Sequence, residues 1–202
     1  MKPLVVIYHS VLGIRGSERN LAEVIRKAGF EVVIPDLYEG KVFADYESAM
    51  KHLGTFGEDG LEHKALTIFL EDQKTNGTRP VIFAGFSNGC NLAQWMSLKT
   101  AETIGTILFH GGFPTRMFGF SQWSPKIPVQ IYYSKEDPWR LEDQEFLQEY
   151  LEQLKESGTK VDFYDYPGTG HLFTDPELSN EYNEVATQDA YQRIQEFLMN
   201  YR

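Results

Sequence analysis

The sequence predicts an α/β protein with a mostly parallel sheet of about six strands and helices on both faces. Short apolar runs rich in β-branched and aromatic residues alternate with longer segments of helical spacing, which is typical of βαβ units. Most of these runs lack polar alternation, as expected of strands covered on both faces. The right-handed crossover rule then places helices on both sides of the sheet. We expect a single domain over residues 1–202, because a chain of this length can bury one sizeable core.

Six strands and five helices are predicted in chain order. The strands are expected at residues 4–8, 31–34, 81–85, 104–110, 129–133 and 161–166, and the helices at residues 17–27, 61–74, 88–98, 141–156 and 182–201. Ser17 is interpreted as a helix N-cap, Gly29 and Gly158 as glycines that end helices, and Pro80 and Pro128 as residues that open strands.

Two stretches, residues 40–60 and 111–126, match neither the strand nor the helix period. In an open α/β sheet, ligands bind outside the carboxyl ends of the strands. The functional residues are therefore expected in the loops that leave those ends.

Composition excludes several classes of function. Lys and Arg number 19 against 29 Asp and Glu, a net charge of −10, which argues against nucleic acid as the main partner. Cys90 is the single cysteine, so an intrachain disulfide and a cysteine-based metal cluster are excluded. No apolar run approaches the ~18 residues of a membrane span, and the N-terminal apolar run is shorter than that of a signal peptide. We expect a cytoplasmic protein without a membrane partner.

Gly85-Phe86-Ser87-Asn88-Gly89 has the pattern G-x-S-x-G between a predicted strand and a predicted helix. That context is required of a nucleophile elbow, whose turn holds the serine in a sparsely populated backbone conformation. Ser87 is therefore the candidate nucleophile. The backbone amide of Asn88 would face a developing oxyanion, and Val11, after the first strand, is the candidate for the second amide. The alternative is that Ser87 only caps the following helix.

A serine nucleophile needs a base and an acid that orients the base. His171 lies in a glycine-rich loop between the last strand and the last helix, and Asp137 follows the fifth strand. The chain order Ser, acid, His is that of the α/β-hydrolases. Asp137 would accept the Nδ1 proton of His171, and its rivals for this role are Glu136 and Asp165.

The other four histidines are interpreted differently. His52 and His63 fall in polar segments and are expected at the surface. His110 ends a strand and could line the site, but a packed or hydrogen-bonded role is favoured, and His9 is interpreted as structural.

Five segments together carry a family resemblance: residues 6–14, residues 35–38, the elbow at Ser87, residues 135–137 and residues 166–173. They resemble the dienelactone hydrolase family, a lidless branch of the α/β-hydrolases, over nearly the whole chain. The resemblance implies an α/β-hydrolase fold with six to seven strands and no large lid. It also implies Ser87, Asp137 and His171 as a catalytic triad, with the amides of Val11 and Asn88 as oxyanion donors.

The sequence departs from the best-known members of that family at two linked positions. Those members use a cysteine nucleophile and place a glutamate after the histidine of the first loop, whereas this chain has Ser87 and Ser10. The pair resembles small serine carboxylesterases and acyl thioesterases of the same fold. We expect a serine hydrolase that cleaves a small carboxylic ester, thioester or lactone through an acyl-enzyme, with no cofactor and no metal, as a monomer or homodimer.

The substrate pocket is the least defined part of this prediction. The aromatic residues Phe113, Phe118 and Trp123 suggest an apolar pocket, although they could equally cover the sheet edge. Arg15 and Arg116 could bind a substrate carboxylate, unless they are solvated.

Two other functions are compatible with parts of the sequence. A weakly catalytic or non-catalytic ligand-binding protein of the same fold is the main alternative, because a fold does not imply a function. Residues 13–16 with Asp36 imitate part of a dinucleotide site, but Val11 stands where the first glycine is required.

Overall fold

The computed structural model describes residues 2–57 and 60–201. Within these ranges six strands form one sheet in the order β2-β1-β3-β4-β5-β6, and every neighbouring pair is parallel. The strands are β1 (Leu4–Tyr8), β2 (Glu31–Val33), β3 (Val81–Phe86), β4 (Thr103–Phe109), β5 (Val129–Ser134) and β6 (Val161–Tyr166). The predicted parallel sheet of about six strands is thereby confirmed, and the predicted strand bounds agree to within one residue.

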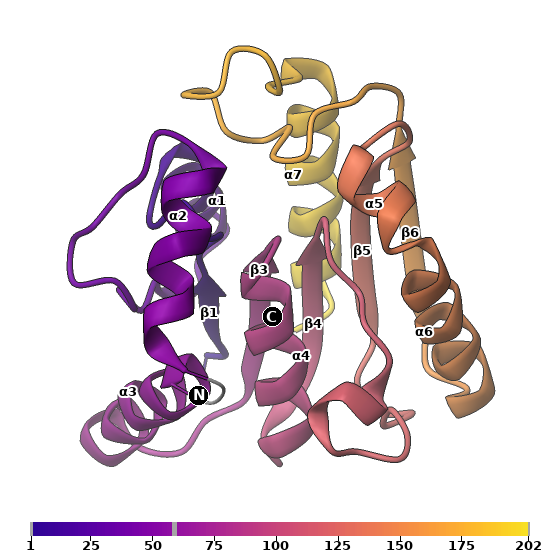
Figure 1. Cartoon of the computed structure of the whole chain (residues 1–202). Coiled ribbons are helices and arrows are strands. Elements are labelled where there is room, and N and C mark those ends of the chain that lie inside the picture. The colour runs from indigo at the N-terminus through magenta and orange to yellow at the C-terminus, as the bar shows by residue number, and fades with distance from the viewer. Residues whose placement is uncertain (1, 58–59, 202) are drawn as a thin grey trace.

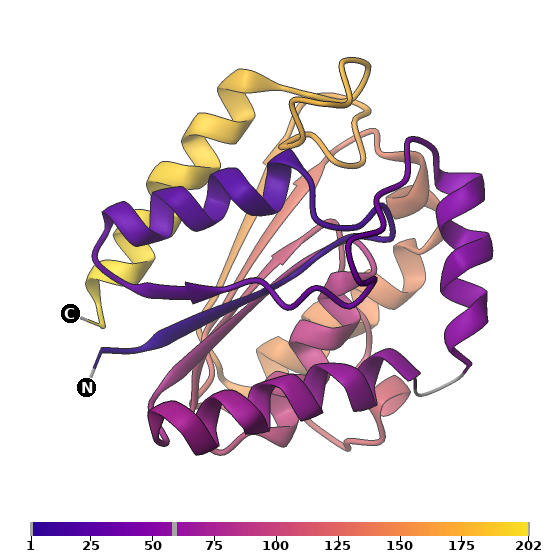
Figure 2. The same cartoon turned by 90° about the vertical axis from the view of Figure 1, so that its left-hand side faces the viewer.

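Helices cover both faces of the sheet (Figures 1 and 2). They are α1 (Gly16–Lys27), α2 (Tyr46–Leu53), α3 (Gly60–Asn76), α4 (Gly89–Lys99), α5 (Pro138–Glu142), α6 (Gln144–Ser157) and α7 (Glu184–Met199), with short 3-10 helices at Gly54–Phe56 and Thr115–Phe118. Figure 2 shows α1 and α7 together on one face, with α3, α4 and α6 on the other.

Two apolar clusters form the core, one on each face of the sheet. Along β1, Val5 and Ile7 pack into the cluster that contains α1 and α7 residues. Leu4, Val6 and Tyr8 pack into the cluster that contains α3, α4 and α6 residues. Both sets are buried, which explains why the strand sequence shows no polar alternation.

The strand order indicates where a ligand-binding region is expected. After β1 the chain builds β2 on one side of it and then returns to build β3 on the other. The carboxyl ends of β1 and β3 are therefore neighbours, with Tyr8 paired to Gly85. Such a switch point is where open α/β sheets bind ligands. Figure 1 shows the loop between β6 and α7 passing over this end of the sheet.

Several local predictions need correction. Ser17 is not the N-cap of α1: the helix begins at Gly16 with Arg15 as N-cap, and the Glu18 carboxylate accepts the Arg15 N–H at 2.9 Å. The predicted helix at 141–156 is two helices that meet at Asp143. Residues 40–60 contain α2, whose N-cap Asp45 accepts the Ser48 N–H; residues 58 and 59 of that stretch lie outside the described ranges.

Candidate active site

Ser87 occupies a sharp turn between β3 and α4. Its backbone φ of 51° is in the left-handed region, a strained conformation for a non-glycine residue. A Cβ at Gly85 would lie 2.2 Å from the carbonyl oxygen of Gly89, and a Cβ at Gly89 would lie 2.4 Å from the carbonyl oxygen of Tyr8. Both glycines of the G-x-S-x-G pattern are therefore required by close backbone approach. This geometry is that of a nucleophile elbow.

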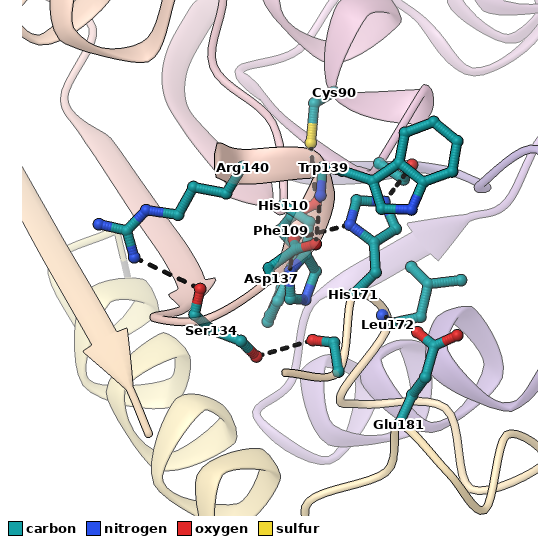
Figure 3. A network of polar contacts seen from close by, with 12 residues as sticks. Cys90, Phe109, His110, Ser134, Asp137, Trp139, Arg140, His171, Leu172 and Glu181 are labelled. Carbon is teal, nitrogen blue, oxygen red and sulfur yellow. Dashed lines mark hydrogen bonds and ion pairs between the residues drawn. The ribbon is translucent and has the colours of Figure 1, made fainter. Parts of the chain in front are cut away.

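The side chains of Ser87, His171 and Asp137 form a continuous chain of hydrogen bonds. Nε2 of His171 lies 2.7 Å from Oγ of Ser87, and Nδ1 of His171 lies 2.7 Å from Oδ2 of Asp137. The three residues come from the loops after β3, β5 and β6. Figure 3 shows Asp137 and His171 directed at each other. The structure thus brings together the three residues that the sequence proposed as a triad.

The protonation states follow from the hydrogen bonds. Burial alone would raise the pKa of Asp137, but its interactions with His110 and His171 outweigh burial and hold that pKa below its usual range. Ionised Asp137 can only accept, so Nδ1 of His171 carries the proton and donates it. Nε2 is then free to accept the Ser87 hydroxyl proton, which is the arrangement that a general base requires.

His110 is a second imidazole at the triad, at a position where the sequence allowed it to line the site but favoured a packed or hydrogen-bonded role. Its Nδ1 lies 3.6 Å from Oδ2 of Asp137, its ring centroid lies 5.2 Å from that of His171, and its side chain is fully buried. Burial lowers the pKa of His110 to about 4, so the ring is neutral near pH 7. The signal in the sequence was positional: His110 follows β4, next to the strand whose end carries Asp137.

Backbone N–H groups of the loop after β1 donate hydrogen bonds to Glu18 and to Ser10, and these bonds fix the loop. Glu18 accepts the Ser10 N–H at 3.1 Å and the Arg15 N–H at 2.9 Å, while Ser10 accepts the Leu12 and Gly13 N–H groups at 3.2 and 3.1 Å. Within residues 2–57 and 60–201, the Val11 amide donates no hydrogen bond. The same is true of Asn88 at the start of α4, and both residues line the pocket beside Ser87.

Glu18 is a residue near the site that sequence reasoning missed. Its side chain is fully buried, and burial raises its pKa to about 7 although three backbone hydrogen bonds oppose the shift. The spacing gave a usable signal, since a Glu three residues after a helix N-cap is the second half of a capping box.

A pocket of about 230 Å³ lies beside Ser87 and His171. Its wall combines aromatic and apolar side chains with several polar ones: Val11, Tyr46, Met50, Leu53, Asn88, Asn91, His110, Phe113, Tyr133, Trp139, Arg140 and Asp143. Helix α2, in the stretch that had no predicted structure, supplies three of these residues.

Of the five residues suggested for the pocket, Phe113 lines it and the other four do not. Arg15 is buried and pairs with Asp175 at 2.6 Å, while exposed Arg116 pairs with Glu149 at 2.8 Å. Trp123 lies in the core, where its indole N–H donates to the carbonyl oxygen of Ile127. Phe118 lines a separate groove with Met117 and Trp95.

The rival acids and the remaining histidines have other partners. Glu136 accepts the Gly168 N–H at 2.7 Å, and Asp165 pairs with Arg140. His9 is hydrogen-bonded to Ser10 and Leu37. His52 is half-buried against the rings of Tyr38, Phe43 and Phe56 rather than at the surface, whereas His63 is exposed.

One cluster in the described ranges has the atoms that bind metals. A ligand atom from each of His110, Asp137 and His171 lies within 4.8 Å of the others. A metal ion there would have to replace the proton between Asp137 and His171. The free thiol of Cys90 is buried beneath the elbow, where it donates to the carbonyl oxygens of Gly85 and Phe109 (Figure 3).

Comparison with known proteins gives a family and a set of structural relatives. The model of the dienelactone hydrolase family matches residues 1–202. Among curated proteins, the uncharacterized protein YczH of Bacillus subtilis is 26% identical over 142 residues, 68% of this chain and 66% of that protein. Protein usf of Aquifex pyrophilus is 22% identical over 98% of this chain and 88% of its own length.

The solved structures share the fold at low sequence identity. The dienelactone hydrolase-like promiscuous phosphotriesterase P91 from metagenomic libraries matches with a TM-score of 0.79 and 18% identity, over 99% of this chain and 87% of its own. Dienelactone hydrolase from Anabaena variabilis matches with a TM-score of 0.69 and 21% identity over the same shares. Searched over residues 2–57 and 60–201, the structure contains no helix with the length and apolar character of a membrane span.

Proposed function

This chain belongs to the dienelactone hydrolase family, and from that membership we propose that it is a serine hydrolase that cleaves small carboxylic esters, thioesters or lactones through an acyl-enzyme. The single observation that supports the proposal most is the unbroken contact chain Ser87–His171–Asp137, with both distances at 2.7 Å. The family and the fold support a hydrolase. The serine mechanism is our inference from this geometry.

The first half-reaction would begin with attack by Oγ of Ser87 on the substrate carbonyl carbon. His171 Nε2 takes the hydroxyl proton as the Oγ–C bond forms, and Asp137 stabilises the resulting imidazolium through Nδ1–H. The amides of Val11 and Asn88 would donate to the tetrahedral oxyanion. The bond from the carbonyl carbon to the leaving oxygen or sulfur then breaks, and His171 returns the proton to that atom.

The second half-reaction would release the acid. Water attacks the acyl carbon of the Ser87 ester while His171 takes a proton from the water. Collapse of the second oxyanion breaks the Oγ–C bond, and Ser87 recovers its proton. The pocket of about 230 Å³ limits the group beside Ser87 to a small one.

The test combines covalent labelling with turnover. We expect a fluorophosphonate to label Ser87 stoichiometrically and the protein to hydrolyse an activated short-chain ester, with both lost in Ser87→Ala. Cys90→Ser is the matched control, because this buried thiol lies three residues away and has no part in the mechanism. Labelling or activity that persists in Ser87→Ala would refute the proposal and leave the alternative, a ligand-binding protein with little or no catalysis.

A further inference from the structure

The pocket contains an aromatic corner formed by Tyr46 and Trp139, next to the reacting atoms. The two ring centroids lie 5.9 Å apart, and they lie 6.1 and 5.6 Å from the ring of His171. Figure 3 shows the Trp139 indole beside the His171 ring. A substrate group bound near the triad would therefore meet the faces or edges of these two rings.

The cationic side chain of the pocket is already neutralised. Arg140 pairs with both carboxylate oxygens of Asp165, at 2.5 and 3.3 Å, and donates to the carbonyl oxygen of Ser134. Its guanidinium also lies over the rings of Tyr133 and Phe163, at 5.3 and 5.6 Å. Arg140 therefore has little capacity left to bind a substrate carboxylate.

Two carboxylates of the same region, Asp143 and Glu181, have no cationic partner among residues 2–57 and 60–201. Asp143 lines the pocket, is half-buried, and forms no ion pair or side-chain hydrogen bond within residues 2–57 and 60–201. Burial, and then the neighbouring Glu142, raise its pKa, as expected of a carboxylate with incomplete hydration and no partner. Glu181 adds a second carboxylate behind the corner, where both its oxygens lie 3.0 Å from the Tyr46 hydroxyl.

Aromatic faces and carboxylates without a cationic partner both attract cations and disfavour anions. Building on the proposed function, we propose that the pocket selects esters bearing a cationic nitrogen, such as a trimethylammonium or alkylammonium group, over neutral esters, and rejects esters bearing a carboxylate. The cation would lie against Tyr46 and Trp139 with Asp143 as its counter-charge. This inference assigns Asp143 as the residue that determines specificity by charge.

The experiment compares matched esters that differ only in charge. Choline butyrate is compared with its carbon isostere, in which a tert-butyl group replaces trimethylammonium, and with a butyrate whose alcohol ends in a carboxylate. A second pair places the trimethylammonium or tert-butyl group at the end of the acyl chain of an ethyl ester. For at least one position, we expect kcat/KM to be about tenfold higher for the cation than for its isostere. We expect the anion to be about tenfold poorer than the isostere at low salt.

Two variants distinguish the effect of the Asp143 charge in the pocket from the effect of the net charge of the protein. Asp143→Asn should bring the ratio of cation to isostere close to one, because the counter-charge of the bound cation is removed. Glu142→Gln removes the same charge from the preceding, exposed residue and should preserve the ratio. A wild-type ratio of one or less at both positions, or equal losses in the two variants, would overturn the charge selection. Absence of neutral-ester hydrolysis would instead refute the proposed function itself.

Discussion

His110 lies 3.6 Å from Asp137, measured from Nδ1 to Oδ2, with both side chains fully buried. Asp137 Oδ2 also accepts from His171, so one oxygen faces two imidazoles. Burial lowers the pKa of His110 from 6.5 to about 4. Between pH 6.5 and pH 4, His110 is therefore protonated in the unfolded chain and neutral in the folded chain. Folding stability should therefore fall as pH drops from about 6.5 to about 4, by up to about 3 kcal/mol from this residue.

The variant His110→Asn tests this relationship. Asparagine tolerates the left-handed backbone found at this position, where φ is 58°, and it does not titrate. The variant should lose less stability than the wild type between pH 7 and pH 4, as measured by urea unfolding at several pH values. Parallel slopes for wild type and His110→Asn would contradict the prediction.

Asp137→Asn should reduce kcat on the order of 10⁴-fold, because the amide NH₂ can donate to Nδ1 and favour the wrong tautomer of His171, and a neutral amide does not stabilise the imidazolium. The rival acids provide the controls. Glu136→Gln and Asp165→Asn remove carboxylates whose partners are Gly168 and Arg140, outside the contact chain. Both variants should retain kcat within a few-fold, measured with an activated ester. A larger loss in either rival than in Asp137→Asn would reassign the orienting acid.

The elbow could be predicted from the sequence because its signal is local. A buried strand, two glycines around Ser87 and a following helix lie within one continuous segment, and close backbone approach accounts for both glycines. Asp137 and His171 could be predicted as its partners because each follows a strand, and the carboxyl ends of parallel strands lie at the same edge of the sheet.

The partners of charged residues could not be predicted, because they depend on contacts distant in the chain. Arg15 was suggested as a ligand of a substrate carboxylate, but it pairs with Asp175, which is 160 residues away in the chain. The pocket wall was missed for a related reason. Residues of α2 reach the pocket only through tertiary packing. The helix itself has eight residues, too few for its hydrophobic periodicity to be recognised in the sequence.

Arg15→Met should destabilise the protein by about 3 to 5 kcal/mol, because it leaves the buried carboxylate of Asp175 without its cation. The double variant Arg15→Met with Asp175→Asn should recover part of that loss, since no unpaired charge remains. Urea unfolding at pH 7 measures both. Arg116→Gln, which removes an exposed ion pair screened by solvent, should cost much less than Arg15→Met. If Arg15→Met unfolded at the wild-type urea concentration and instead raised KM, Arg15 would bind substrate after all.

Glu18→Gln should lower kcat by about tenfold to a hundredfold with little change in KM, because Glu18 positions the loop that carries the Val11 amide. The carboxylate accepts two backbone N–H groups with separate oxygens. A glutamine can accept only one, and its NH₂ group would face the other N–H, which displaces Ser10 or Arg15. Oxyanion donors act more strongly on the transition state than on the bound substrate, so the loss should appear in kcat.

Steady-state kinetics on a neutral ester measures this loss, and the control is Glu23→Gln, on the exposed face of the same helix. Equal losses in kcat for the two variants, or a loss confined to KM, would show that the buried carboxylate does not position the oxyanion loop.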